Sequence, residues 1–138
     1  MPGTRKLGRP TAHRMAMLRG MVTYLLEHGQ LETTYTRAKE VSALAEKMIT
    51  LGKKNTLQSY RQLLAFITKE DVAKKVTTVY ASDYENMNGG YTQVYKMGPR
   101  RGDGAEMAVI RLKAVEVAQP EQKPARKRAK KVEAADAE

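Results

Sequence analysis

The first twenty residues of the chain contain five basic side chains and no acidic one. A segment whose charges share one sign repels itself in water and binds readily to a dense array of opposite charge. Nucleic-acid phosphates form such an array, and Lys and Arg side chains neutralise them by direct contact. The sequence therefore predicts a polyanion-binding segment at the N-terminus. Its predicted phosphate contacts are Arg5, Lys6, Arg9, Arg14 and Arg19.

A second basic group surrounds the stretch 98–105, which is rich in Gly and Arg. Lys96, Arg100 and Arg101 can contact phosphate from the tip of a hairpin, because the forked guanidinium of Arg suits paired hydrogen bonds to phosphate oxygens. The alternative is a solvated, charged turn. Both interpretations stay open at the level of the sequence.

Two aromatic side chains and one imidazole are further candidates for contacts with RNA or DNA. Tyr91 and Tyr95 are expected on one face of a strand, where either ring can stack on a base, although burial against helices explains them equally well. His13 lies between basic residues at the start of a helix. It contacts a phosphate or a base, or else it is a solvated surface residue.

The residue types needed for catalysis are missing or isolated. The only histidines, His13 and His28, are fifteen residues apart at opposite ends of one expected helix, so they cannot share a metal. No Ser, His and Asp constellation is recognisable around either of them. The glycines flank expected strands and do not lead into a helix, as a phosphate-binding loop would. We therefore expect no catalytic residue, no metal site, no cofactor and no small-molecule substrate.

Composition and charge indicate one basic, globular domain. The chain has 138 residues and a net charge of +10, of which residues 1–20 carry +5, 21–90 carry +1, 91–113 carry +3 and 114–138 carry +1. The middle of the chain is thus nearly neutral, and the field that attracts an anionic partner arises at its two flanks. Cysteine is absent and no apolar run reaches the roughly 20 residues that span a bilayer. We expect a cytoplasmic protein without a membrane partner.

The spacing of apolar residues and turn signals predicts the order of elements. Residues 1–10 read as an extended basic arm, and Thr11 can cap a helix that ends at Gly29. A short strand follows at 30–34. Thr36 or a neighbouring Thr then caps a second helix, which ends near Gly52.

The second half of the chain is predicted to contain two more helices and a hairpin. Thr56 opens the third helix, and Thr68 with Asp71 forms a capping box for the fourth. Strands at 91–97 and 107–112 are joined by the turn at 98–105 as an antiparallel hairpin. Residues 114–138 have the composition of a flexible, charged tail. The folded unit is therefore expected at 11–113.

Four blocks of the sequence resemble one family in order and spacing. The longest is LETTYTRAKEVSALAEKMITLGK at 31–53. The others are Gly8-Arg9 with His13-Arg14-Met15-Ala16-Met17, then Asn88-Gly89-Gly90-Tyr91-Thr92, and finally Arg101-Gly102-Asp103-Gly104-Ala105 with Met107-Ala108. Together they cover about residues 6–112, and they are similar to bacterial large-subunit ribosomal protein number seventeen.

This resemblance implies an α+β fold of helix, strand, three helices and two strands, with the segment around Leu31 joining the hairpin in a small sheet packed on the helices. It implies a structural component of the large ribosomal subunit that binds large-subunit ribosomal RNA and contacts neighbouring ribosomal proteins. Further polar contacts to RNA are implied where the second helix begins. They are Thr33, Thr34, Arg37 and Lys39.

Two other functions are compatible with the charge. A nucleoid-type DNA-binding protein would share the positive field, but no recognition-helix motif is visible. A small RNA-modifying enzyme would need an acid-base pair, a cofactor loop or a metal set, and none emerges from the sequence. Competition between duplex DNA and ribosomal RNA separates the first of these from the ribosomal function.

Overall fold

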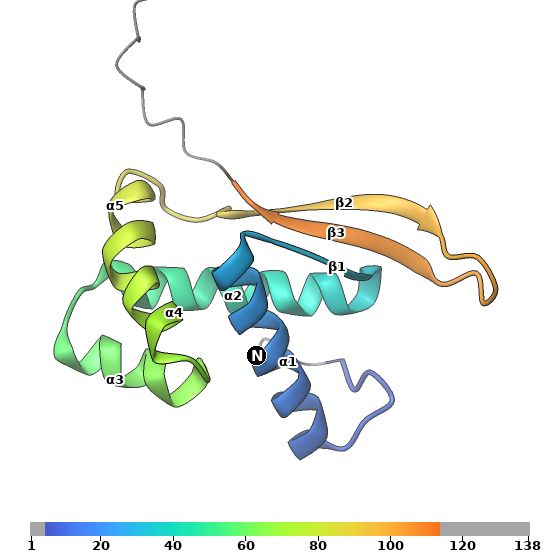
Figure 1. Cartoon of the computed structure of the whole chain (residues 1–138), viewed down its shortest axis with the longest axis horizontal. Coiled ribbons are helices and arrows are strands. Elements are labelled where there is room, and N and C mark those ends of the chain that lie inside the picture. The colour runs from blue at the N-terminus through green and yellow to red at the C-terminus, as the bar shows by residue number, and fades with distance from the viewer. Residues whose placement is uncertain (1–4, 114–138) are drawn as a thin grey trace, which may run out of the picture.

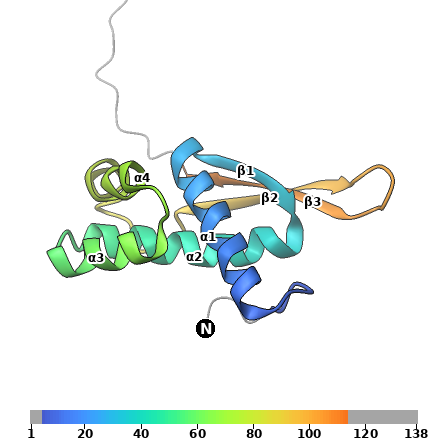
Figure 2. The ribbon, with the colours of Figure 1, turned by 60° about the horizontal axis from the view of Figure 1, so that its bottom comes forward.

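The computed structural model describes residues 5–113, and its helices pack on one face of a small sheet (Figures 1 and 2). The α+β fold and its order of elements are confirmed. The elements are α1 (Thr11–His28), β1 (Gln30–Thr34), α2 (Tyr35–Lys53), α3 (Leu57–Phe66), α4 (Glu70–Lys75), η1 (Val76–Tyr80), α5 (Ala81–Asp83), β2 (Thr92–Pro99) and β3 (Glu106–Leu112).

The three strands form one antiparallel sheet in the order β1-β3-β2. The strand around Leu31 therefore joins the hairpin, as expected, by pairing Leu31 with Ile110. The register between β2 and β3 shifts between Lys96 and Gly98, so Met97 is an extra residue that forms a β-bulge. Beyond the bulge the hairpin projects past the N-terminal end of α2, away from α3 (Figures 1 and 2).

Helix α2 is the central element, and it packs against the sheet, α1, α3 and η1. Its buried side chains recur at helical spacing from Ala38 to Gly52, while residues such as Lys39 and Lys47 form an exposed strip. The fully buried side chains Val41 and Ile49 come from α2, Leu25 comes from α1, and Ile110 comes from β3. One continuous core therefore joins the sheet to the helices.

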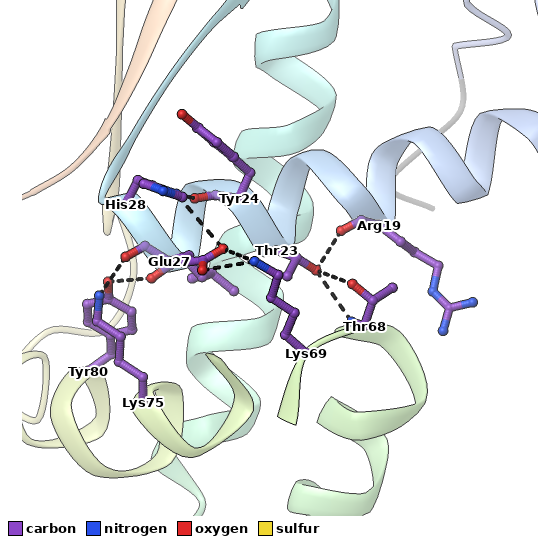
Figure 3. A network of polar contacts seen from close by, with 10 residues as sticks. Arg19, Thr23, Tyr24, Glu27, His28, Thr68, Lys69, Lys75 and Tyr80 are labelled. Carbon is purple, nitrogen blue, oxygen red and sulfur yellow. Dashed lines mark hydrogen bonds and ion pairs between the residues drawn. The ribbon is translucent and has the colours of Figure 1, made fainter. Parts of the chain in front are cut away.

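The C-terminal half of α1 is fixed to α4 and η1 by polar contacts (Figure 3). Lys69 forms a salt bridge of 2.6 Å with Glu27, and this hydrogen-bonded partner lowers the pKa of the Glu27 carboxyl. Tyr80 Oη donates to the carbonyl of Leu26 at 2.7 Å, and Lys75 Nζ donates to that of Glu27 at 2.8 Å. These two bonds satisfy carbonyl groups that the end of a helix leaves without an internal partner.

Some of the predicted helix boundaries are confirmed. Gly29 ends α1 in the left-handed region with φ of 80°, a conformation that glycine adopts without steric cost. Thr56 caps α3 through a reciprocal capping box with Ser59. Both signals are local, because they depend on residues within one helical turn.

Two predicted N-caps are wrong, and the cap predicted for the second helix at Thr36 or a neighbouring Thr falls on Thr34. Pro10 holds the N-cap position of α1, so Thr11 is already helical. Thr34 holds that of α2 without a side-chain capping bond, and Thr36 lies inside the helix. Lys69 holds that of α4, because the Thr68 hydroxyl instead faces Thr23 Oγ1 of α1, 3.5 Å away. The expected Thr68 capping box with Asp71 does not form.

The fourth predicted helix is one helical segment with a change of pitch. Its middle, η1, is a π-helix, in which the N–H of Ala81 donates to the carbonyl of Val76. Such a turn shifts the faces that follow it. Tyr80 is therefore buried, whereas its neighbour Val79 is 45% exposed.

The described part of the predicted arm is not extended. Residues 5–10 form a turn, in which Arg9 N–H donates to the carbonyl of Lys6, and Leu7 packs against the core. Burial of an apolar side chain is favourable and holds this turn against the body. The predicted tail, 114–138, and residues 1–4 of the arm lie outside the described residues.

Two glycines in helices provide a matched test of packing. A Cβ at Gly52 would lie 2.6 Å from Val76 Cγ1, whereas a Cβ at Gly20 meets nothing within 4 Å. We expect Gly52→Ala to destabilise the fold by about 1–3 kcal/mol through overpacking. Gly20→Ala is the control, and it should stabilise by about 0.5–1 kcal/mol. Urea unfolding measures both, and equal effects of the two substitutions would contradict this packing.

Candidate nucleic-acid interface

Basic side chains from three segments gather where α2 begins. We call this region the basic end, and it comprises the turn at 5–10, the first turns of α2 and the projecting hairpin (Figure 1). Helix α3 lies at the opposite end of α2 in both ribbon views (Figures 1 and 2). The basic side chains of the basic end are Arg5, Lys6, Arg9, Arg37, Lys39, Lys96, Arg100 and Arg101.

The ring of Tyr35 lies between two of these cations. Lys96 Nζ from the hairpin is 4.7 Å from its centroid, and Lys39 Nζ from α2 is 5.6 Å away. Both ammonium groups belong to exposed residues, so they are accessible to an anion as well as to the ring. Because Thr34 forms no side-chain cap, the partial positive charge at the start of α2 adds to theirs.

The N-terminal turn is connected to α2 by an ion pair. Arg5 Nε lies 3.6 Å from Glu40 Oε1, and Glu40 is 8% exposed. Arg9 contacts the sulfur of Met17 with its guanidinium, so its charged group lies close to the surface of α1. Lys6 is exposed. The structure thus brings the N-terminal cations to the same end of the molecule as Arg37 and Lys39.

The hairpin tip contains an internal ion pair. Arg100 donates from Nε to Asp103 Oδ1 at 3.0 Å and from Nη2 to Asp103 Oδ2 at 2.5 Å. The Arg100 guanidinium and, after it, the Ala105 amide lower the pKa of the Asp103 carboxyl to about 2. Arg100 is therefore engaged within the turn, while the neighbouring Arg101 is exposed and has no polar partner among the described residues.

The start of α1 presents His13 and Arg14 differently. His13 is exposed, so it can take either role predicted for it. Arg14 is half-buried, and its Nε has no hydrogen-bond partner among residues 5–113. An unpaired buried donor is unfavourable, so an acceptor from outside the described residues would improve this site.

Arg19 does not belong to the basic end, and its predicted contact with phosphate stays a prediction. Its Nε donates to the carbonyl of Phe66 at 2.9 Å, and Nη2 donates to that of Ala65. Its guanidinium also lies 5.8 Å from the centre of the Phe66 ring. Arg19 thus caps the C-terminal end of α3, a role that stabilises the fold.

Two other residues with predicted contacts, Tyr91 and Thr33, have buried side chains, and their contacts with RNA stay predictions. Tyr91 is 1% exposed, packs 5.0 Å from the ring of Tyr84 and donates from its hydroxyl to the carbonyl of Met87. Tyr95 is 50% exposed, so the two tyrosines do not share a face. Thr33 is 8% exposed in the sheet, whereas Thr34 is half-buried at the start of α2.

Sequence reasoning missed Tyr35, the residue around which Lys39 and Lys96 converge. Its signal was present, because an aromatic residue precedes two basic residues at the expected start of a helix. The contribution of Lys96 was not visible, since it depends on the pairing of β2 with β3 and on how the hairpin lies over α2.

Metal sites and membrane-spanning helices are two other possibilities within residues 5–113. In this part of the chain, no group of three or more His, Asp or Glu side chains is arranged to hold a metal ion. None of the helices described is both long enough and apolar enough to cross a membrane. The clustered cations are therefore the clearest candidate for function within the described range.

Comparison with known proteins agrees with this fold. The family described as Ribosomal protein L17 matches residues 17–113. The chain belongs to this family. A relative from Clostridium tetani, named large ribosomal subunit protein bL17, is 60% identical over 112 residues, which cover 81% of this chain and 99% of that protein. The protein of the same name from Clostridium acetobutylicum is 59% identical over 110 residues, covering 80% and 96%.

The role of Arg19 as a cap predicts a loss of stability on substitution. Arg19→Ala removes charged hydrogen bonds to two carbonyls, and we expect it to lower the free energy of unfolding by about 1–3 kcal/mol. Arg61→Ala is the control, because Arg61 is an exposed residue of α3 and should change stability by less than about 0.5 kcal/mol. Thermal unfolding measures both, and an unaltered R19A variant would restore Arg19 as a free surface cation.

The Arg100–Asp103 pair predicts an unusual titration. The Asp103 carboxyl should titrate near pH 2 instead of its ordinary value of 3.8. Because the pKa is lowered, the pair is intact above the ordinary value and is lost only as the pH falls through about 2. Carbon-detected NMR measures this pKa directly. In an Arg100→Gln variant the pKa of Asp103 should rise toward 3.8, and an equally low value there would exclude Arg100 as the main cause.

Proposed function

We propose that this protein is a structural component of the bacterial large ribosomal subunit, where its basic end binds large-subunit ribosomal RNA. The observation that best supports RNA binding is that Lys39, Lys96 and the turn at 5–10 meet at the start of α2, although they come from three distant segments. Membership of the ribosomal protein L17 family supports the assignment. The proposed location is the ribosome in the cytoplasm.

Scaffolding by charge is the proposed mechanism, and no catalytic step is part of it. Where RNA segments converge, their phosphates repel one another, and cations placed between them reduce this repulsion. Exposed side chains such as Lys6 and Arg101 supply mobile cations, while Tyr35 holds Lys39 and Lys96 in place. Contacts of this kind position the protein and do not read sequence.

The remaining surface is proposed to serve a different partner. Around α3, exposed apolar side chains such as Leu57, which is 67% exposed, and Leu64, which is 38% exposed, lie beside the basic residue Arg61. This end is suited to neighbouring ribosomal proteins, since it lies away from the basic end (Figure 1). We infer that the molecule bridges RNA at one end and protein at the other.

Salt dependence tests the RNA-binding proposal. Affinity of the full chain for a large-subunit ribosomal RNA transcript should fall with a slope of log affinity against log salt larger than about 4 in magnitude, if six or more phosphates are contacted. Filter binding or anisotropy at several salt concentrations gives this slope. A slope near zero would exclude electrostatic binding, and equal affinity for duplex DNA would favour the nucleoid-type alternative.

A matched pair of substitutions locates the contact. Arg101→Gln at the hairpin tip and Arg61→Gln on α3 each remove one exposed positive charge. We expect the first to reduce the magnitude of the salt slope by about 1 and the second to leave it unchanged. Equal effects of both would show that only total charge matters, and the basic end would then have no special role.

A further inference from the structure

The sheet has a second face that takes no part in the basic end. Ala108 and Ile110 of β3 point toward α2 and are fully buried, so the residues between them point to the opposite side. Register places two rows of side chains on this outer face. One row is Gln93, Arg111 and Gln30, and the other is Tyr95, Val109 and Glu32.

Most of this face is accessible. Of the six residues in the two rows, Val109 is half-buried and the other five are exposed, so nothing among the described residues covers the face. A shallow depression of about 320 Å³ continues it past β1 as far as Tyr24 of α1. The face therefore extends from Tyr95 on one edge strand to Tyr24 beyond the other.

The residues at the two ends of this face, Tyr95 and Tyr24, are aromatic and half-exposed. Tyr95 is 50% exposed, and its hydroxyl donates to Gln93 Oε1 at 2.6 Å, which restricts the orientation of the ring. Tyr24 is 48% exposed and stacks on His28 with 4.1 Å between the ring centroids. Tyr24 and His28 project from the side of α1 turned away from α4 (Figure 3).

This combination of side chains matches the chemistry of unpaired nucleobases. Aromatic rings provide flat surfaces on which bases stack, and this contact tolerates any base sequence. Amide and guanidinium groups, here Gln93, Gln30 and Arg111, form hydrogen bonds with the exposed edges of bases. In a double helix the base faces are stacked and the Watson–Crick edges are paired, so neither is available to the sheet.

A protein partner fits the same face less well. The centre of a protein interface is depleted in charged residues, whereas Arg111 and Glu32 here lie on either side of the single aliphatic residue Val109. The hairpin that carries Tyr95 also carries Lys96 and Arg101 of the basic end. A strand of RNA held by those cations can therefore continue directly onto this face.

We propose that the outer face of the β1-β3-β2 sheet binds unpaired nucleobases of RNA, with Tyr95 and Tyr24 as stacking surfaces. This inference rests on the proposed RNA-binding function. The inference adds base stacking to the proposed phosphate binding. Stacking requires single-stranded nucleotides, whereas the basic end requires only phosphates.

A fluorescein-labelled 12-nucleotide oligoadenylate, with the full-length chain, is the probe for this site. We expect Tyr95→Leu and Tyr24→Leu each to weaken binding roughly 5- to 100-fold, the range for loss of one base-aromatic stack. Tyr95→Phe keeps the ring and should retain affinity within about 2-fold of the wild-type protein. Leu57→Ala, an exposed apolar residue on α3, is the control and should have no effect.

Two further measurements distinguish failure of the stacking site from failure of the proposed RNA-binding function. Because no charge is removed, Tyr95→Leu should leave the salt slope unaltered, and a fluorescein-labelled RNA duplex should bind the variant and the wild-type protein equally. If the salt slope is steep but both Leu variants bind the oligonucleotide with wild-type affinity, the stacking site is wrong and the proposed function stays intact. A slope near zero would remove the proposed function itself.

Retention of the variants on the large ribosomal subunit tests whether the outer face binds a protein instead of RNA. Variants that bind oligoadenylate normally but are lost from large subunits in a high-salt wash would identify the outer face as a contact with another protein, and the stacking proposal would then be wrong. Since Tyr95 and Tyr24 are both half-exposed and lie on different elements, a folding defect in one variant leaves the other as an independent test.

Discussion

The burial of α2 on several sides at once is the constraint on which the rest of the structure depends. The helix supports the sheet, α1, α3 and η1, and one of its neighbours comes so close that Gly52 has no room for a side chain beside Val76. A helix packed in this way presents to a partner its ends and the exposed strip that includes Lys39 and Lys47. Its N-terminal end, where Thr34 provides no side-chain cap, is the end that meets the hairpin and the N-terminal turn.

The basic side chains have different roles at the two ends of α2. Cations near α3 and α4 are largely used inside the protein, as Arg19 caps α3, Lys69 pairs with Glu27 and Lys75 binds the end of α1. Cations at the start of α2 are held by a ring or remain exposed. Two residues of the same type can therefore have opposite roles, and position in the fold decides between stabilising the protein and attracting a polyanion.

Local sequence signals predicted much of the fold, and contacts between distant residues explain most of the errors. Gly29 and Thr56 were predicted correctly because a cap depends on neighbours within one turn. Thr68 failed as a cap because Thr23, 45 residues away, faces its hydroxyl. Arg19 lies outside the basic end because the end of α3, 46 and 47 residues away, offers it two carbonyls. The gathering of cations at α2 follows from strand pairing, which the composition of single segments does not contain.

The bulge at Met97 also affects the protein before it meets any partner. Strand β2 is an edge of the sheet, and an edge with free backbone groups can pair with the same edge of a second molecule. Here the bulge interrupts the regular spacing of those groups, Lys96 adds a charge beside it, and Pro99 lacks an N–H at the end of the strand. Newly synthesised chains are thereby protected from edge-to-edge aggregation while the hairpin stays long enough to reach outward.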